Sequence, residues 1–115
     1  MELFTDLATS AIERALDGVA TRQRVSAHNI ANVATPGFRA SRVAFEDDLA
    51  AAIGRGAPST ADPSVLAANT PARADGNNVV LEDETQIMVT SGLHYEALVQ
   101  ALNYKLSVLR TAVGP

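Results

Sequence analysis

The chain has 115 residues, no cysteine and a formal net charge of −4 at pH 7. A chain of this length makes one small domain, and without cysteine it can form neither a disulfide framework nor a thiolate metal site. The acidic balance argues against nucleic acid as a partner, because phosphate binding needs a concentrated basic face. Hydrophobic residues make up 47% of the sequence but aromatic residues only 4%. This composition, rich in alanine, suits slender helices that bury their surface against partners.

The sequence shows no sign of membrane insertion or of a cleaved leader. No stretch reaches the roughly 18 consecutive apolar residues of a membrane span. Residues 1–6 lack the basic and apolar regions of a secretory signal. We therefore expect no membrane span, and any export would use a route without a cleaved signal peptide.

Residues 1–34 are predicted to form a long helix. Its apolar residues recur at helical spacing, with a stripe made of Phe4, Ala8, Ala11, Ala15 and Val19. Gly18 is expected to weaken the middle of this helix by about 1 kcal/mol relative to alanine. The helix should stop near Ala34, because Thr35 precedes a proline and Pro36-Gly37 suits the centre of a type II turn.

Residues 35–80 are predicted to form a turn and a flexible insert. Phe45 to Ile53 has the pattern of a short helix. Gly54 to Asn78 is rich in Gly, Pro, Ala, Asn and Thr and has few apolar anchors, so we expect a mobile loop that contains a turn at Asp75-Gly76-Asn77.

Residues 81–115 are predicted to form a second long helix with a heptad seam. Apolar or small residues alternate in steps of four and three, at Met88, Gly92, Tyr95, Val99, Leu102, Leu106, Leu109 and Val113. About 30 residues at ~1.5 Å each make a rod of roughly 45 Å. Such a helix needs the first helix, neighbouring subunits or both to bury its seam.

The polar residues do not predict a catalytic, cofactor or metal site. The two histidines, His28 and His94, have no second histidine or carboxylate at ligand spacing. The acidic runs lack the order of a calcium loop. The basic cluster in the first half (Arg14, Arg22, Arg24, Arg39 and Arg42) and the acidic run Glu82–Glu84 are interpreted as solvated helix surface. We therefore expect the protein not to be an enzyme.

A short polar motif marks the end of the first helix. Asn29 and Asn32 are three residues apart and lie on neighbouring turns of one face. Their amides can donate hydrogen bonds to the unpaired carbonyls at the helix end or to carbonyls on an adjacent helix. After the Pro-Gly turn, Phe38 can pack against the helix as an anchor. The residues alone also fit a generic helix stop followed by a turn.

This motif resembles the N-terminal signature of flagellar axial proteins, the family of rod, hook and hook–filament junction subunits. The residues that match are Asn29, Ala31, Asn32, Thr35, Gly37, Phe38 and Arg39, with Pro36 inside the turn. The C-terminal half is similar to proximal rod proteins of this family in four segments: 75–79, 81–84, 93–103 and 109–112. The middle of the chain differs most from the family pattern, because a basic residue and a histidine expected after Asp62-Pro63 are missing.

The resemblance implies an all-α fold in which the two long helices pair as an antiparallel coiled-coil hairpin, with a short helix and an irregular loop between them. It implies a structural subunit of the proximal rod, the tubular drive shaft that transmits torque and encloses the export channel. The implied partners are other copies of the chain, neighbouring rod proteins, a rod-base adaptor and the export gate. The implied location is the periplasmic rod of the basal body. A cytosolic helical-hairpin adaptor or regulator is the alternative function.

Phe45 and Leu49 form an apolar pair with helical spacing beside an acidic face. They can dock the insert onto the long helices. The resemblance adds a second hypothesis, that they are a Phe-x-x-x-apolar signal read by the export gate.

Overall fold

The structure is a computed structural model that describes residues 2–114, with side chains described from residue 7 onward. Phe4 of the predicted stripe therefore lies outside the described side chains. The element order is α1 (Glu2–Ala31), β1 (Ser41–Ala44), α2 (Glu46–Gly54), the 3-10 turn η1 (Pro58–Thr60), β2 (Ser64–Ala67) and α3 (Leu81–Val113). The molecule is elongated, with extents of 65 × 27 × 14 Å.

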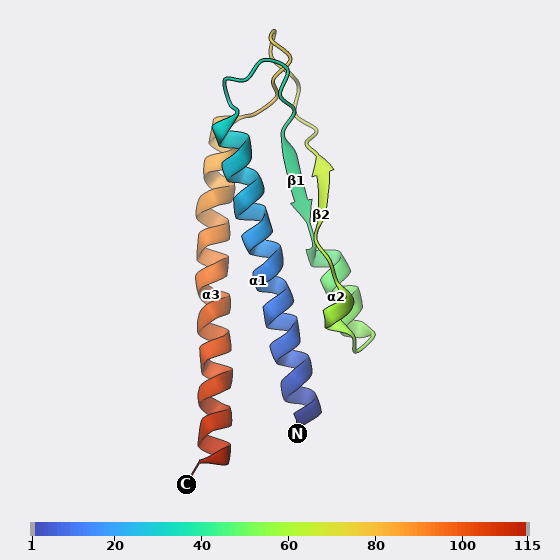
Figure 1. Cartoon of the computed structure of the whole chain (residues 1–115), viewed down its shortest axis with the longest axis vertical. Coiled ribbons are helices and arrows are strands. Elements are labelled where there is room, and N and C mark those ends of the chain that lie inside the picture. The colour runs from blue at the N-terminus through green and yellow to red at the C-terminus, as the bar shows by residue number, and fades with distance from the viewer. Residues whose placement is uncertain (1, 115) are drawn as a thin grey trace.

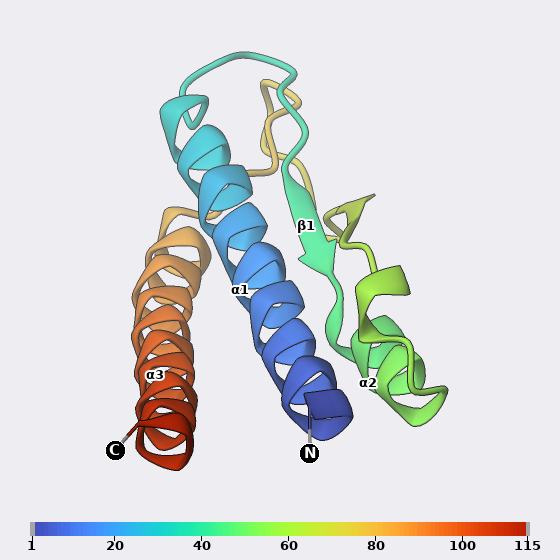
Figure 2. The same ribbon diagram turned by 60° about the horizontal axis from the view of Figure 1, so that its bottom comes forward.

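The two long helices run antiparallel and pack against each other (Figure 1). In both views α1 lies between α3 on one side and β1 with α2 on the other (Figure 2). The prediction of two long terminal helices that pack together is confirmed. The acidic first turn of α3 and Arg110 in its last turn both complement the helix dipole.

The prediction of a purely α-helical chain is wrong, because β1 and β2 form a two-stranded antiparallel sheet. The register pairs Ser41 with Ala67 and Ala44 with Ser64. Each strand has four residues, which is too short for an alternating pattern to stand out in the sequence. The segment expected to be a mobile loop therefore contains η1 and β2.

The short helix predicted around Phe45 to Ile53 is confirmed as α2, and it docks onto α1 through a small apolar core. This core consists of Val19, Val43, Phe45, Leu49, Ala52 and Ala61. A second cluster near the loop end contains Ala40, Ala68 and Val79, with Val33 and Phe38 packed against it. Among residues 2–114, no helix is both long and apolar enough to cross a lipid bilayer.

Candidate assembly site

A fully buried carboxylate joins α3 to α1 and β1. Glu84, in the first turn of α3, has an exposed fraction of 0%. Its Oε1 accepts hydrogen bonds from Ser26 Oγ at 2.9 Å and Asn29 Nδ2 at 3.0 Å, and its Oε2 pairs with Arg42 Nη1 at 2.6 Å. Because every oxygen has a donor, the buried charge is compensated, and the group can stay inside the protein.

Asn29, the first asparagine of the predicted motif, also closes one edge of the sheet. Its Nδ2 donates to the Ser41 carbonyl at 2.9 Å, and its Oδ1 accepts from the Ser41 N–H at 3.2 Å. The side-chain amide thus takes the place of a neighbouring strand. Asn29 is 0% exposed, so in the single chain this motif residue is an internal structural group.

Asn32 and Asn77 satisfy carbonyls at the C-terminal end of α1. Asn32 Nδ2 donates to the His28 carbonyl at 2.9 Å. Asn77 Nδ2 donates to the carbonyls of Asn32, Val33 and Thr35 at 2.8–3.2 Å. The last carbonyls of a helix have no intrahelical partner, and these amides supply one. The long helix therefore ends in a bonded cap supplied from 45 residues away in the chain.

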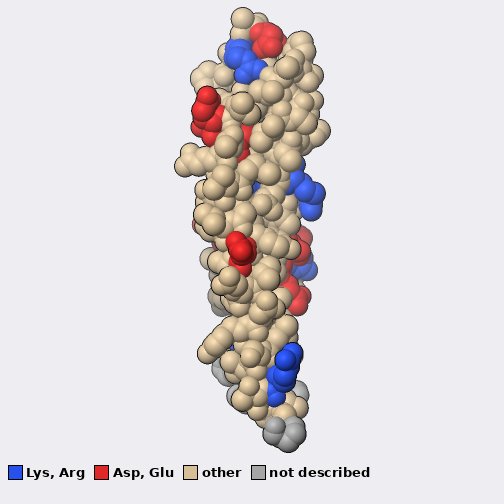
Figure 3. Space-filling model, turned by 90° about the vertical axis from the view of Figure 1, so that its left-hand side faces the viewer, with Lys and Arg blue, Asp and Glu red and all other residues tan. Residues whose placement is uncertain are grey.

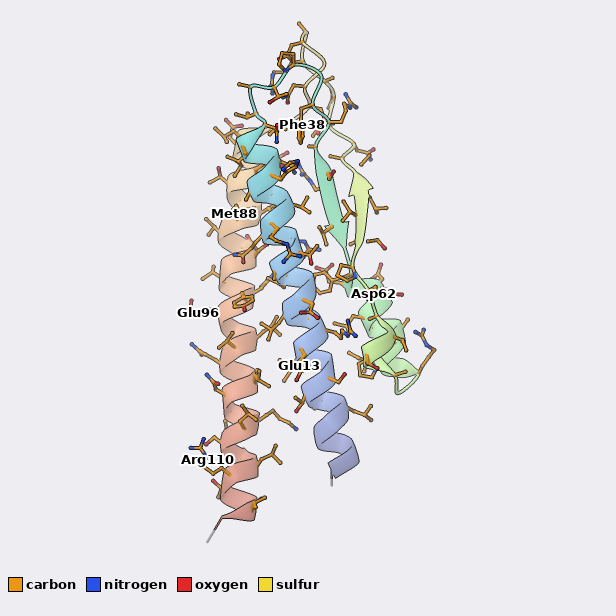
Figure 4. All side chains as sticks on the ribbon, in the orientation of Figure 1. Glu13, Phe38, Asp62, Met88, Glu96 and Arg110 are labelled. Atoms are coloured by element: carbon orange, nitrogen blue, oxygen red, sulfur yellow. The ribbon has the colours of Figure 1, made fainter. Side chains whose placement is uncertain are left out.

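The turn after α1 has the predicted geometry. The Phe38 N–H donates to the Thr35 carbonyl at 3.2 Å, and Gly37 has a φ of +75°. A positive φ at the third residue of the turn is the mark of type II and favours glycine. Phe38 then lies below the loops at this end of the hairpin (Figure 4), with its ring edge-on to His28 at a centroid separation of 5.5 Å.

The remaining residues of the predicted motif lie on the surface. Ala31, Thr35, Pro36 and Gly37 are exposed, and Phe38 is half-buried. The structure therefore divides the motif into an internal part around Asn29 and an exposed part around the turn. A role in assembly stays a prediction for the exposed part.

Phe45 and Leu49 both lie in the core, each 8% exposed. Arg22 of α1 lies over Phe45: its guanidinium is 4.8 Å from the centre of the ring and bonds both carboxylate oxygens of Glu46 at 2.7 Å. These hydrogen bonds from Arg22 lower the pKa of Glu46 to about 2. The docking of the insert is thus directly visible, and an export role for the pair stays a hypothesis.

The predicted seam of α3 lies on the side facing α1 and along the edges of that contact. Met88, Val99, Leu102 and Leu109 are half-buried, while Tyr95 is 40% and Leu106 47% exposed. Glu84, Ser91 and Leu98, seven residues apart, form the row nearest to α1 and its core. Leu106 and Val113, at the C-terminal end of the seam, are exposed in the single chain, so their burial in an assembly stays a prediction.

The outer face of α3 presents large apolar side chains and little charge. Val89, Leu93 and Tyr104 are 60%, 63% and 71% exposed. Between Thr85 and Tyr104 the sequence has a single Asp, Glu, Lys or Arg residue, Glu96. The α3 side of the molecule is accordingly almost free of charged atoms over long stretches (Figure 3). Large exposed apolar patches are typical of interaction sites on proteins.

A hollow of about 420 Å³ lies between α1, β1 and α3. Its lining includes Arg22, Arg42, Asp83 and His94. Both arginines are already paired with carboxylates, and no group of potential metal ligands occurs in the described part of the chain.

Sequence reasoning missed the central role of the charged residues. Arg42 and Glu84 were interpreted as solvated surface, yet Glu84 is buried and the two form an ion pair. The acid could not be told from its exposed neighbours Glu82 and Asp83 by residue type. The sequence signal for its burial was its position, because residues seven apart share one helix face and Glu84 lies on the same face as Ser91 and Leu98.

The chain matches no protein-family model, but it is similar to several curated proteins. It is 28% identical to the flagellar basal body rod protein FlgB of Bacillus subtilis (strain 168), over 98% of this chain and 97% of that protein. It is 32% identical to the protein of the same name from Cereibacter sphaeroides, over 81% of this chain and 83% of that protein. With the FlgB of Borrelia hermsii it shares 50% identity over 45% of this chain and 36% of that protein. This chain therefore belongs to the family of the flagellar basal body rod protein FlgB.

Proposed function

We propose that the chain is a structural subunit of the proximal rod in the bacterial flagellar basal body, without enzymatic activity. The observation that carries the proposal is the relationship to FlgB proteins along almost the whole chain. The structure agrees with a structural role, because its buried polar groups are engaged in holding the fold together.

The proposed assembly uses the long hairpin as its building block. One hairpin leaves the outer face of α3 exposed, with Leu93 and Tyr104 in water. Covering this face with neighbouring copies and other rod proteins would remove apolar surface from water, which drives association. Contacts between unlike faces of identical chains generate helical tubes, the form required of a drive shaft around an export channel.

The proposed location is the periplasmic rod, reached by export without a cleaved signal peptide. The base of the rod would contact an adaptor and the export gate. A signal made of Phe45 and Leu49 would have to be read before folding, because both side chains are buried in the folded chain.

A complementation experiment tests the proposed function. In a strain that lacks this chain, the wild-type gene should restore swimming, and the protein should co-purify with basal bodies. Leu93→Asp puts a charge on the outer face of α3 and should abolish swimming without unfolding the monomer, whereas Ser59→Asp, in an exposed turn, should swim normally. Absence of the wild-type protein from purified basal bodies would refute the proposal and favour a cytosolic adaptor.

A second experiment separates export from packing at Phe45. Phe45→Ala and Val19→Ala both weaken the same core, but only the first alters the candidate signal. If the pair is an export signal, Phe45→Ala should accumulate in the cytoplasm while Val19→Ala still leaves it. Equal export of both variants, followed by poor assembly, would leave packing as the role of Phe45.

A further inference from the structure

The sequence contains two Asp-Gly pairs, and the fold holds them in different ways. Asp17-Gly18 lies in the middle of α1, whereas Asp75-Gly76 lies in a turn at the loop end of the hairpin (Figure 1). Aspartate rearranges most readily when glycine follows it, because glycine has no side chain to obstruct the attack of its nitrogen. The same reactive pair thus occurs once in a rigid helix and once in an open turn.

The turn around Asp75 is small and exposed. The Gly76 N–H donates to the Arg73 carbonyl at 2.9 Å, and the Arg73 N–H donates to the Asn77 carbonyl at 2.7 Å. The Asp75 carbonyl accepts from the Gly37 N–H at 2.8 Å, and the Asp75 side chain is 42% exposed. Turning the peptide group between Asp75 and Gly76 out of this position therefore breaks only its two main-chain hydrogen bonds.

The Asp75 carboxyl is also turned towards the nitrogen that would attack it. Its Oδ1 accepts a hydrogen bond from the Asn77 N–H at 3.0 Å. The side chain therefore folds over the Gly76 nitrogen, which lies between these two groups along the chain. Little rotation is needed to bring this nitrogen to the carboxyl carbon.

The carboxyl of Asp17 is directed the other way. Side chains on a helix point towards its N-terminus, and Asp17 Oδ2 accordingly lies 3.9 Å from Arg14 Nη1, one turn back. Gly18 is buried, with the Phe45 ring directly over it. Its N–H belongs to the hydrogen-bond ladder of the helix. Attack by this nitrogen would require α1 to open at its middle.

We propose that Asp75 is a site of spontaneous modification, at which the folded chain rearranges aspartate to isoaspartate while Asp17 is spared. The Gly76 nitrogen attacks the carboxyl carbon of protonated Asp75. The new C–N bond closes a cyclic imide, and the hydroxyl of the carboxyl leaves as water with the proton of the nitrogen. Water then opens the ring. Cleavage of the new bond restores aspartate, whereas cleavage of the original peptide bond leaves isoaspartate, through whose side-chain carbonyl the chain continues.

The rearrangement would disturb the ends of both long helices. Isoaspartate lengthens the main chain by one carbon atom, two residues before Asn77. The Asn77 amide donates to three carbonyls at the end of α1, and its Oδ1 accepts from the Val79 N–H, just before α3, at 2.7 Å. Displacement of this one side chain would therefore loosen the cap of α1 and the entry to α3 together. The modification is independent of the proposed rod function, because it needs only the folded chain and water.

Peptide mapping of the aged protein tests the proposal. The folded chain is kept in a mildly acidic buffer, because the protonated carboxyl is the form that loses water, and is then cut with trypsin. The two pairs fall into separate peptides, 15–22 and 74–105. Isoaspartate has the mass of aspartate, so it is recognised by the separate elution of its peptide and located by fragmentation. It should accumulate at Asp75 at least about tenfold faster than at Asp17, because a turn opens more readily than the middle of a long helix.

Unfolded protein and two variants provide the controls. In urea both pairs lose their native setting, so the two rates should approach each other. Asp75→Glu keeps the carboxylate but must close a larger and slower-forming ring, so it should remove the reaction from the folded chain, and Asp17→Glu should leave it unchanged. Equal rates in the folded chain, including no reaction at either pair, would overturn the proposal. A preference for Asp75 that is as large in urea as in the folded chain, or isoaspartate undiminished in Asp75→Glu, would do the same.

Discussion

At the scale of single residues, the fold depends on polar groups that are buried and fully bonded. Glu84 receives hydrogen bonds from Ser26 and Asn29 and an ion pair from Arg42. These partners come from α1 and β1, so one carboxylate ties three elements together. A buried ion pair usually stabilises a protein little more than well-packed apolar residues at the same positions would. Removing only one of its partners is costly, however, because the other is left as an uncompensated buried charge.

Removing Arg42 should therefore be costly. Arg42→Ala leaves the Glu84 carboxylate buried without its cation and should lower the free energy of unfolding by about 3 kcal/mol. Urea titration followed by circular dichroism measures this change. Glu82→Gln, which alters an exposed acid in the same turn, should change it by less than about 0.5 kcal/mol. Similar values for the two variants would show that the pair contributes nothing specific.

Gly18 is required for packing, which the sequence could not reveal. A Cβ at this position would lie 2.4 Å from Cγ of Phe45. Gly18→Ala should therefore lower stability by about 1–3 kcal/mol through overpacking, in spite of its better helix propensity.

Gly92→Ala provides the matched control, because its Cβ meets only Gln23 Nε2 at 3.5 Å. This variant should gain up to about 1 kcal/mol from helix propensity. The stability of each variant relative to the wild type can be measured by thermal unfolding. If Gly18→Ala stabilises the protein as much as Gly92→Ala does, the Phe45 ring can move aside and the predicted overpacking is wrong.

At the scale of elements, local patterns predicted the helices and missed the strands. The periodicity of residues 1–34 and 81–115 is long enough to indicate two helices, and the Pro36-Gly37 turn follows from chain stereochemistry. β1 and β2 are held by distant groups: the amides of Asn29 and Asn78 take the places of missing strands. Such contacts join residues far apart in the chain, so no local window contains them.

The docking of α2 onto α1 should depend on pH through Glu46. Its pKa falls from 4.5 to about 2 because of the hydrogen bonds from Arg22. A depressed pKa in the folded state stabilises the fold above the unfolded value, and the contribution disappears as the pH falls from about 4.5 to 2. Because Glu46 is 59% exposed, the effect should be at most about 1 kcal/mol.

Comparison with Glu46→Gln isolates this contribution from that of the other carboxylates. The wild type should be the more stable protein at pH 6, and the difference should shrink as the pH falls from about 4.5 and vanish below about pH 2, as measured by chemical unfolding at each pH. A difference that stays constant over this range would mean that the Arg22 pair is not its source.

At the scale of the whole molecule, the hairpin is secured at one end and open at the other. Near the loops, α3 buries Glu84 and Ser91 against α1, and Asn77 caps α1. Towards the C-terminal end of α3, Tyr104 is 71% and Val113 84% exposed. A subunit built in this way can fold at the loop end before partners complete the other end.

Hydrogen exchange on dilute protein should reveal this gradient. Amides at residues 84–91 should exchange more slowly than those at 104–111 of the same helix, because local opening is easiest where few buried contacts must break. Arg42→Ala should speed exchange at 84–91 and leave 104–111 unchanged, which separates the loss of the network from general unfolding. In assembled basal bodies the 104–111 segment should become protected, because neighbouring subunits would cover it. Uniform protection along α3 in the monomer would show instead that the hairpin is complete without partners.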